Sequence, residues 1–120
     1  MRSNSSVAAY LAEELPHLGI THVFELVGGR SSEIIDSMHK NPALTVVSMH
    51  HEQGAGFAAE GYTRTSGKPS LALATSGPGA TNLLTAIGSC YFDSIPVIFI
   101  TGQVNRSETR RDGRGRQGGF

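Results

Sequence analysis

Residues 70–82 read Ser-Leu-Ala-Leu-Ala-Thr-Ser-Gly-Pro-Gly-Ala-Thr-Asn and contain the clearest change of pattern in the chain. The run from Ser70 to Thr75 is short and mostly apolar, which is typical of a buried strand. The glycines and the proline that follow are typical of a tight turn, and Pro78 suits the first position of a helix. The stretch therefore predicts a strand, a glycine-rich turn and a helix that runs to about Phe92.

The same alternation extends outward from this stretch in both directions. A first helix is expected after Ser5 or Ser6, with one apolar face made of Val7, Leu11, Leu15 and Leu18. Two more helices are expected over residues 31–40 and 52–65, and three more strands over residues 20–27, 44–49 and 95–101. Strands that alternate with helices predict an α/β fold, a doubly wound parallel sheet with helices on both faces.

The composition excludes several classes of protein. The 120 residues are enough for one domain, and the formal net charge is zero, which argues against nucleic acid or a membrane surface as a partner. Cys90 is the only cysteine, so no intrachain disulfide can form, and we expect this residue to be buried in a helix. No apolar run is long enough to cross a membrane, and the first residues lack the apolar core of a signal peptide. A cytoplasmic location is expected.

The last part of the chain, residues 102–120, has no periodicity and is expected to be an irregular tail rich in glycine and arginine. Without aromatic residues between them, its arginines fit a solvated loop or a loop that covers an active site better than a contact with phosphates. These arginines are Arg106, Arg110, Arg111, Arg114 and Arg116.

Glycine-rich or polar loops follow three of the expected strands. They contain Gly28-Gly29, His50-His51-Glu52, and Ser76 to Asn82. In a parallel sheet the carboxyl ends of the strands open on one edge, and ligands bind there. We therefore expect these three loops to meet.

Glu52 opens the third expected helix, where a carboxylate is favoured by the helix N-terminus. The same helix contains Gly54, Gly56 and Gly61, each of which costs about 1 kcal/mol relative to alanine. Gly54, Ala58 and Gly61 fall on one face, and this smooth stripe predicts that another backbone or a second subunit packs there. The alternative is that the helix packs tightly on its own sheet.

The turn at residues 76–82 does not match a known phosphate loop. No Gly-Lys-Ser/Thr follows, and Pro78 removes a backbone donor where a phosphate would need one. The glycines favour the approach of a flat, uncharged group, which Asn82 would also reach. His50 and His51 point in different directions as neighbours, so no metal ligands are assigned.

Residues 51–64, HEQGAGFAAEGYTR, resemble the HEQ…A…A.GYAR segment of thiamine-diphosphate-dependent enzymes of the acetolactate synthase type. Residues 76–82 are similar to the next signature of that family, and residues 93–97 and 101–104 are similar to its following segments. The resemblance runs from about Ser6 to Phe120. It implies an N-terminal pyrimidine-binding domain over residues 1–120, with the flavodoxin-like thiamine-diphosphate-binding fold, as a fragment of a longer chain.

The resemblance also implies a role for individual residues. Glu52 would hydrogen-bond N1′ of the cofactor pyrimidine and favour the imino tautomer, whose 4′ nitrogen removes the C2 proton of the thiazolium. Pro78 and Asn82 would line the pyrimidine pocket. Leu26 would face the cofactor, and Gly28 would allow its close approach.

The cofactors and partners follow from the same resemblance. Thiamine diphosphate would be bound with Mg²⁺, which a Gly-Asp-Gly segment in a domain absent from this chain would hold, usually on a partner subunit. The stripe of Gly54, Ala58 and Gly61 would then belong to the interface of a homodimer or homotetramer. Whether FAD is also bound in the full-length protein stays open.

Three functions remain after this reasoning. The first is a carboligase or 2-oxo-acid decarboxylase similar to acetolactate synthase, a transferase or lyase with a place in branched-chain amino acid biosynthesis. The family's usual Gly-Tyr-Pro-Gly-Gly run reads Glu25-Leu26-Val27-Gly28-Gly29 here, so the substrate is left open. The second is a non-catalytic α/β module that forms an interface or regulates a partner. The third, a nucleotide-binding flavodoxin-like domain, is disfavoured by the missing phosphate loop.

Overall fold

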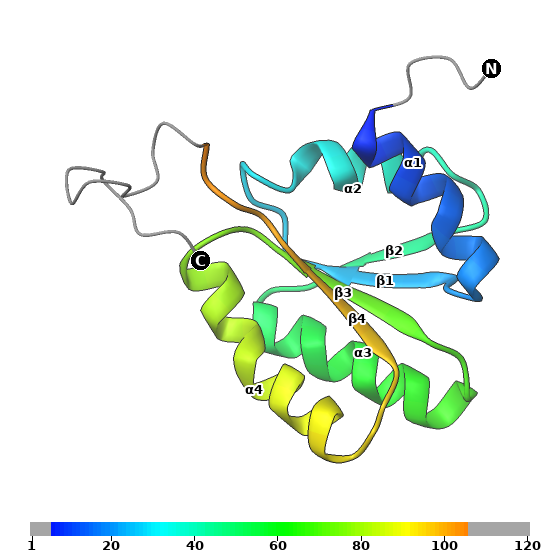
Figure 1. Ribbon diagram of the computed structural model, residues 1–120, viewed down its shortest axis with the longest axis vertical. Coiled ribbons are helices and arrows are strands. Elements are labelled where there is room, and N and C mark those ends of the chain that lie inside the picture. The colour runs from blue at the N-terminus through cyan, green and yellow to red at the C-terminus, as the bar shows by residue number, and fades with distance from the viewer. Residues whose placement is uncertain (1–5, 106–120) are drawn as a thin grey trace.

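The computed structural model describes residues 6–105 as a four-stranded sheet with helices on both faces (Figure 1). The predicted alternation of helices and strands is confirmed. Residues 102–105 form no helix or strand, as expected for the tail, while the arginine-rich part of the tail lies outside the described residues. The elements are α1 (Val7–Glu14), the 3₁₀ turn η1 (Leu15–Leu18), β1 (His22–Glu25), α2 (Ser32–His39), β2 (Thr45–Ser48), α3 (Glu52–Ser66), β3 (Ser70–Ala74), α4 (Pro78–Phe92) and β4 (Val97–Thr101).

All four strands run parallel, in the spatial order β2-β1-β3-β4. Helices α1 and α2 cover one face of the sheet, and α3 and α4 cover the other (Figure 1). The doubly wound α/β fold is therefore confirmed. Because β2 and β3 lie on opposite sides of β1, the crevice at the carboxyl ends of β1 and β3 is the switch point at which such sheets bind ligands.

Alternate residues of the central strands supply two separate cores. Side chains on one face pack with α1 and α2, and the larger ones are Val23, Leu71 and Leu73. On the other face, Phe24, Ala72 and Ala74 pack with α3 and α4. Two of these three are alanines, so α3 and α4 can lie close to the sheet.

The apolar face predicted for the first helix is only partly confirmed, because Leu15 is buried but two other members of that face are largely exposed. Val7 is 76% exposed and Leu18 is 62% exposed. The α-helix ends at Glu14, and Pro16, which has no N–H to donate, lies in the tighter 3₁₀ turn that follows. The change of helical period in this turn moves Leu18 away from the expected face, whereas Val7 is exposed at the start of the α-helix, before the turn. The residues that are buried in this segment are Ala8, Ala12 and Leu15.

Each strand is shorter than its apolar run predicts. In β1, for example, pairing begins at His22 and ends at Glu25, although the run extends from Ile20 to Val27. Ile20 is fully buried outside the strand, and Val27 is 62% exposed because the chain has already turned away from the sheet. Apolar character therefore located the strands but did not give their ends.

Helices α3 and α4 pack closely because of one glycine in α3. A Cβ atom built on Gly56 would lie 2.4 Å from the Cβ of Ala86 in α4, so only glycine fits there. Gly61 has nothing within 4 Å of such an atom, and Gly54 has only the end of the Met49 side chain at 3.9 Å. The tight packing on the chain's own elements explains Gly56 but not the stripe of Gly54, Ala58 and Gly61.

Polar contacts join the other ends of these two helices. Glu60 Oε1 accepts hydrogen bonds from Arg64 of the same helix and from Ser89 Oγ of α4, at 2.7 and 3.0 Å. Arg64 also pairs with Asp93 at the end of α4. The hydrogen bonds to Asp93 and, to a smaller extent, to Glu60 raise the pKa of the Arg64 guanidinium. Cys90 is buried beside them, as expected, and burial raises the pKa of its thiol.

We predict that Gly56→Ala destabilises the full-length protein by about 1–3 kcal/mol, because two Cβ atoms cannot occupy the space between α3 and α4. Gly88→Ala in α4 is the matched control. Its new Cβ would meet nothing within 4 Å, and alanine stabilises a helix interior by about 1 kcal/mol relative to glycine. Thermal unfolding should show opposite changes, and equal melting temperatures for the two variants would contradict this packing.

Candidate functional site

The loops after β1, β2 and β3 converge at the carboxyl edge of the sheet, as predicted. Thr75, directly after β3, lies between two of the segments that form this edge. A Cβ atom on Gly28, in the loop after β1, would lie 2.5 Å from Thr75 Cβ. A Cβ atom on Gly79, in the first turn of α4, would lie 2.9 Å from Thr75 Cγ2. Close backbone approach to one side chain therefore joins the two loops.

Glu52 is the first residue of α3, where the loop after β2 ends. His51 is the N-cap, and its Nδ1 accepts a hydrogen bond from the N–H of Gln53 at 3.1 Å. His51 therefore caps the N-terminus of α3. No group of three His, Cys, Asp or Glu side chains that could hold a metal ion occurs within residues 6–105. The Glu52 side chain is half-buried at the positive end of the α3 dipole, which stabilises a carboxylate.

Asn82 approaches Glu52 from the neighbouring helix. The Asn82 amide donates a hydrogen bond from Nδ2 to Glu52 Oε2 at 3.0 Å. This bond joins two residues thirty positions apart in the sequence. The bond to Asn82 fixes the rotation of the Glu52 carboxyl group. Oε2 accepts this bond, and Oε1 lies on the side of Gly79.

Gly79 leaves room beside this carboxyl group. A Cβ atom at residue 79 would lie 3.3 Å from Glu52 Oε1, close enough to push it aside. Before it, Gly77 caps α4 with a φ of 65°, a left-handed conformation that favours glycine. Pro78 occupies the first turn of α4, as predicted, and is exposed. The Gly-Pro-Gly run thus starts a helix without crowding Glu52.

The structure places all the predicted site residues at one edge of the sheet. Leu26 directly follows β1 and is half-buried, and its N–H donates to the carbonyl of Leu73 at 3.2 Å. The sequence predicts that Gly28 allows a cofactor to approach closely. Within the chain, the lack of a side chain at Gly28 makes room for Thr75. The cofactor contacts of Leu26, Gly28, Pro78 and Asn82 stay predictions.

Sequence reasoning missed three residues of this edge. Gly79 and Thr75 belong to the quoted turn, but only coordinates show that Gly79 leaves room beside Glu52 and that Thr75 fills the space between two loops. Glu25, the last residue of β1, is 1% exposed although it is acidic. A glutamate at the end of an apolar strand is the signal that could have been noticed.

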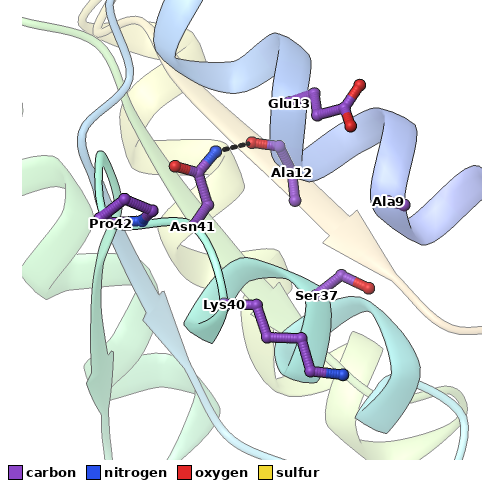
Figure 2. Close-up of a pocket in the computed structure, with 7 residues that line it drawn as sticks. All are labelled: Ala9, Ala12, Glu13, Ser37, Lys40, Asn41 and Pro42. Atoms are coloured by element: carbon purple, nitrogen blue, oxygen red, sulfur yellow. Dashed lines mark hydrogen bonds between the residues drawn. The ribbon is translucent and has the colours of Figure 1, made fainter.

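Two of the hollows in the structure lie away from Glu52 and Asn82, which do not line them. One, of about 320 Å³, lies between α1 and α2 (Figure 2). Its wall includes Asn41, whose amide donates to the carbonyl of Ala12 at 2.7 Å and joins the two elements (Figure 2). The other, of about 560 Å³, lies nearer the carboxyl edge and is lined by residues including Gly29, Arg30, Ser32 and Gln103.

Within residues 6–105, no helix combines the length and the apolar character needed to cross a bilayer.

A doubly wound parallel sheet with a glutamate and an asparagine facing one another at its carboxyl edge defines a cofactor-binding domain. The sequence matches the family described as "Thiamine pyrophosphate enzyme, N-terminal TPP binding domain" over residues 5–119. The chain belongs to this family. Thiamine pyrophosphate (TPP) is the cofactor called thiamine diphosphate above, and the resemblance noted in the sequence is confirmed.

Plant acetolactate synthases are among the similar proteins. The chain is 46% identical over 99 residues to "Probable acetolactate synthase 2, chloroplastic" of Oryza sativa subsp. japonica. It is 48% identical over 99 residues to "Acetolactate synthase, chloroplastic" of Arabidopsis thaliana. In both cases the match covers 82% of this chain and 15% of the relative. The chain therefore spans about 15% of the length of these relatives.

The residues at the carboxyl edge fit one end of this cofactor. An aminopyrimidine is flat, and it offers ring nitrogens and an exocyclic amino group. A carboxyl group that is held in one orientation and bordered by glycine can meet a ring nitrogen in the plane of the ring. The described part of the chain offers no matching cluster of metal ligands for a diphosphate-bound cation.

We predict that Gly79→Ala weakens TPP binding by the full-length protein about tenfold, because the new methyl group must displace Glu52 Oε1 or Thr75. Gly29→Ala is the control, since a Cβ there meets nothing within 4 Å. Titration calorimetry with TPP and Mg²⁺ measures both affinities. Equal affinities for the two variants would show that the space beside Glu52 does not matter for binding.

Proposed function

We propose that this chain forms the pyrimidine-binding half of the active site in an enzyme similar to acetolactate synthase, and that Glu52 activates the cofactor through N1′. The family match and the similarity to acetolactate synthases support the first part of this proposal. The observation that carries the second part is the orientation of Glu52, whose Oε2 is bonded to Asn82 while Oε1 lies beside Gly79.

When it is bound, the cofactor supplies a carbon nucleophile, which the side chains of the protein cannot provide. Glu52 would hold a proton at N1′ of the pyrimidine through its free Oε1. Asn82 would keep the Glu52 carboxyl group from rotating during this proton transfer. Leu26 and Pro78 would add apolar surface around the bound ring.

The substrate class follows from the similarity rather than from the described residues. A 2-oxo acid such as pyruvate is the proposed donor, with carboligation or decarboxylation as the reaction and branched-chain amino acid biosynthesis as its setting. The relatives are named acetolactate synthases, which supports carboligation. The cytoplasmic location expected from the sequence stays a prediction, and the relatives named above are described as chloroplastic.

We predict that Glu52→Gln in the full-length enzyme lowers kcat by about 10²–10⁴-fold, the usual contribution of a general acid or base. Glu33→Gln is the matched control, because Glu33 is also in the first turn of a helix but is exposed on α2. Exchange of the cofactor C2 proton with deuterium, followed by NMR, should slow in step with kcat.

Intact turnover in Glu52→Gln would exclude this mechanism. A second measurement separates an enzyme from a non-catalytic module. If TPP with Mg²⁺ fails to raise the melting temperature of the full-length wild-type protein, the chain does not bind the cofactor at all.

The remaining half of the site would come from elsewhere in the assembly. We propose that a partner subunit supplies the domain that holds the diphosphate and Mg²⁺, and that FAD, if the enzyme uses it, also binds outside this chain. The stripe of Gly54, Ala58 and Gly61 supports a subunit interface, because nothing in the described chain packs closely against Gly61. Phe57, on the same helix, is 41% exposed and adds apolar surface.

We predict that Gly61→Leu dissociates the full-length dimer or tetramer and lowers its apparent TPP affinity, because a large side chain would keep two closely packed helices apart. His39→Leu, an exposed position on α2 at the opposite face of the sheet, controls for added apolar surface. Sedimentation velocity at several protein concentrations would detect the change. An unaltered sedimentation coefficient for Gly61→Leu would place the interface elsewhere.

A further inference from the structure

Glu25 is a buried acidic residue that the proposed mechanism does not use. It is the last residue of β1, the strand that lies between β2 and β3, and its side chain is 1% exposed. Its register partners are Ser48 in β2 and Leu73 in β3. Acidic residues are rarely buried to this extent unless they are paired, because loss of hydration is costly. A position beside Leu73 would accept an apolar side chain, so the presence of an acid needs a reason.

The contacts of Glu25 are directed at the end of β2. Its Oε1 accepts a short hydrogen bond from the hydroxyl of Ser48, the last residue of β2. Its main-chain carbonyl accepts a hydrogen bond from the N–H of Met49 at 2.7 Å. Side chain and main chain of one residue thus hold two consecutive residues of the neighbouring strand.

The held segment leads directly into the catalytic helix. After Met49 come His50 and His51, and Glu52 is already the first residue of α3. No regular element separates the point of attachment from the Glu52 carboxyl group. The position at which β2 ends therefore determines where α3 begins.

Small displacements of the Glu52 carboxyl group would break its contacts. Its Oε2 must stay within hydrogen-bond distance of Asn82 Nδ2, now 3.0 Å, while Oε1 must stay clear of Gly79. Misplacement of a catalytic group by about 1 Å can cost about a hundredfold in rate. A fixed anchor on the strand before α3 would limit such a displacement.

Burial without full hydrogen bonding also marks Glu25 as unusual. Its Oε2 is one of two buried side-chain oxygen or nitrogen atoms that lack a hydrogen-bond partner among residues 6–105. The other is Oε2 of Glu60, whose carboxyl group joins α3 to α4, so each of the two buried acids links two elements of the fold.

We propose, on the basis of the function proposed above, that Glu25 is a positioning residue that fixes the end of β2 through Ser48 and Met49 and so sets the place of Glu52. Glu25 acts through the segment of residues 48–52, and its effect on the reaction is carried by Glu52.

The test uses Glu25→Ala and Ser48→Ala in the full-length enzyme. Both remove the bond between Glu25 and Ser48, and Ser48→Ala does so at an exposed residue with little loss of packing. Hydrogen–deuterium exchange of the cofactor-free protein should show faster exchange in residues 48–53. With cofactor, kcat should fall about tenfold to a hundredfold while the substrate KM changes little. The double variant should show the same exchange rates and the same kcat as Glu25→Ala, because both substitutions break the same hydrogen bond.

Two further variants separate positioning from stability. Glu25→Gln keeps an oxygen that can accept from Ser48, so it should restore slow exchange in residues 48–53. Ser70→Ala removes a buried hydroxyl that bonds Ala59 and Thr63 at the opposite end of β3, so it should lower the melting temperature without faster exchange in residues 48–53. Unchanged exchange in this segment in both Glu25→Ala and Ser48→Ala would overturn the proposal, as would equally faster exchange throughout the sheet.

Failure of the proposed function gives a different result. Should Glu52→Gln prove active, the role of Glu52 would be wrong, yet the exchange measurement on the cofactor-free protein would still report whether Glu25 fixes the end of β2. Faster exchange in residues 48–53 with unchanged kcat in Ser48→Ala would overturn the link from Glu25 to catalysis.

Discussion

The carboxyl edge of the sheet is packed around the side chain of Thr75. Gly28 approaches it from the loop after β1, and Gly79 approaches it from the first turn of α4. Neither position can carry a Cβ atom without a collision. This one contact sets the distance between the two loops that border the switch point of the sheet, and the position of α4 follows from it. Asn82 lies one turn further along that helix, so its reach to Glu52 depends on the same packing.

The second constraint is the closeness of α3 and α4. Gly56 lets Ala86 approach the α3 backbone, Glu60 is bonded to Ser89 one turn later, and Arg64 pairs with Asp93 near the C-terminal ends of the two helices. These contacts hold the two helices together along their length, and the carboxyl group of Glu52 lies at the end of the pair nearest the sheet edge. A hydrogen bond between side chains thirty residues apart can then form at 3.0 Å without any covalent link.

The fold could be predicted from the sequence because its signals are local. Apolar runs, glycine turns and the proline at residue 78 fix the order of the elements, and the order fixes which loops meet. The packing partner of each glycine could not be predicted, since Gly56 and Gly61 look alike in the sequence but face Ala86 and open space. The buried face of the first helix was only partly found, because its buried residues include the small Ala8 and Ala12, and because the 3₁₀ turn at Pro16 changes the helical period before Leu18. Glu52 was found from its place at a helix start, whereas Glu25 was overlooked although it stands inside an apolar run; its contact with Ser48, on a strand twenty-three residues later, is visible only in the structure.

The packing around Thr75 has a consequence for how this domain can diverge. The methyl and hydroxyl groups of Thr75 fill the volume that side chains at residues 28 and 79 would need. A smaller residue at 75 would release that volume and could admit a methyl group at one of the two glycines. Substitutions at these three positions should therefore be non-additive. Because residues 28, 75 and 79 share one volume, a larger side chain at one position requires a smaller one at another. Homologous domains are therefore expected to change these three residues together.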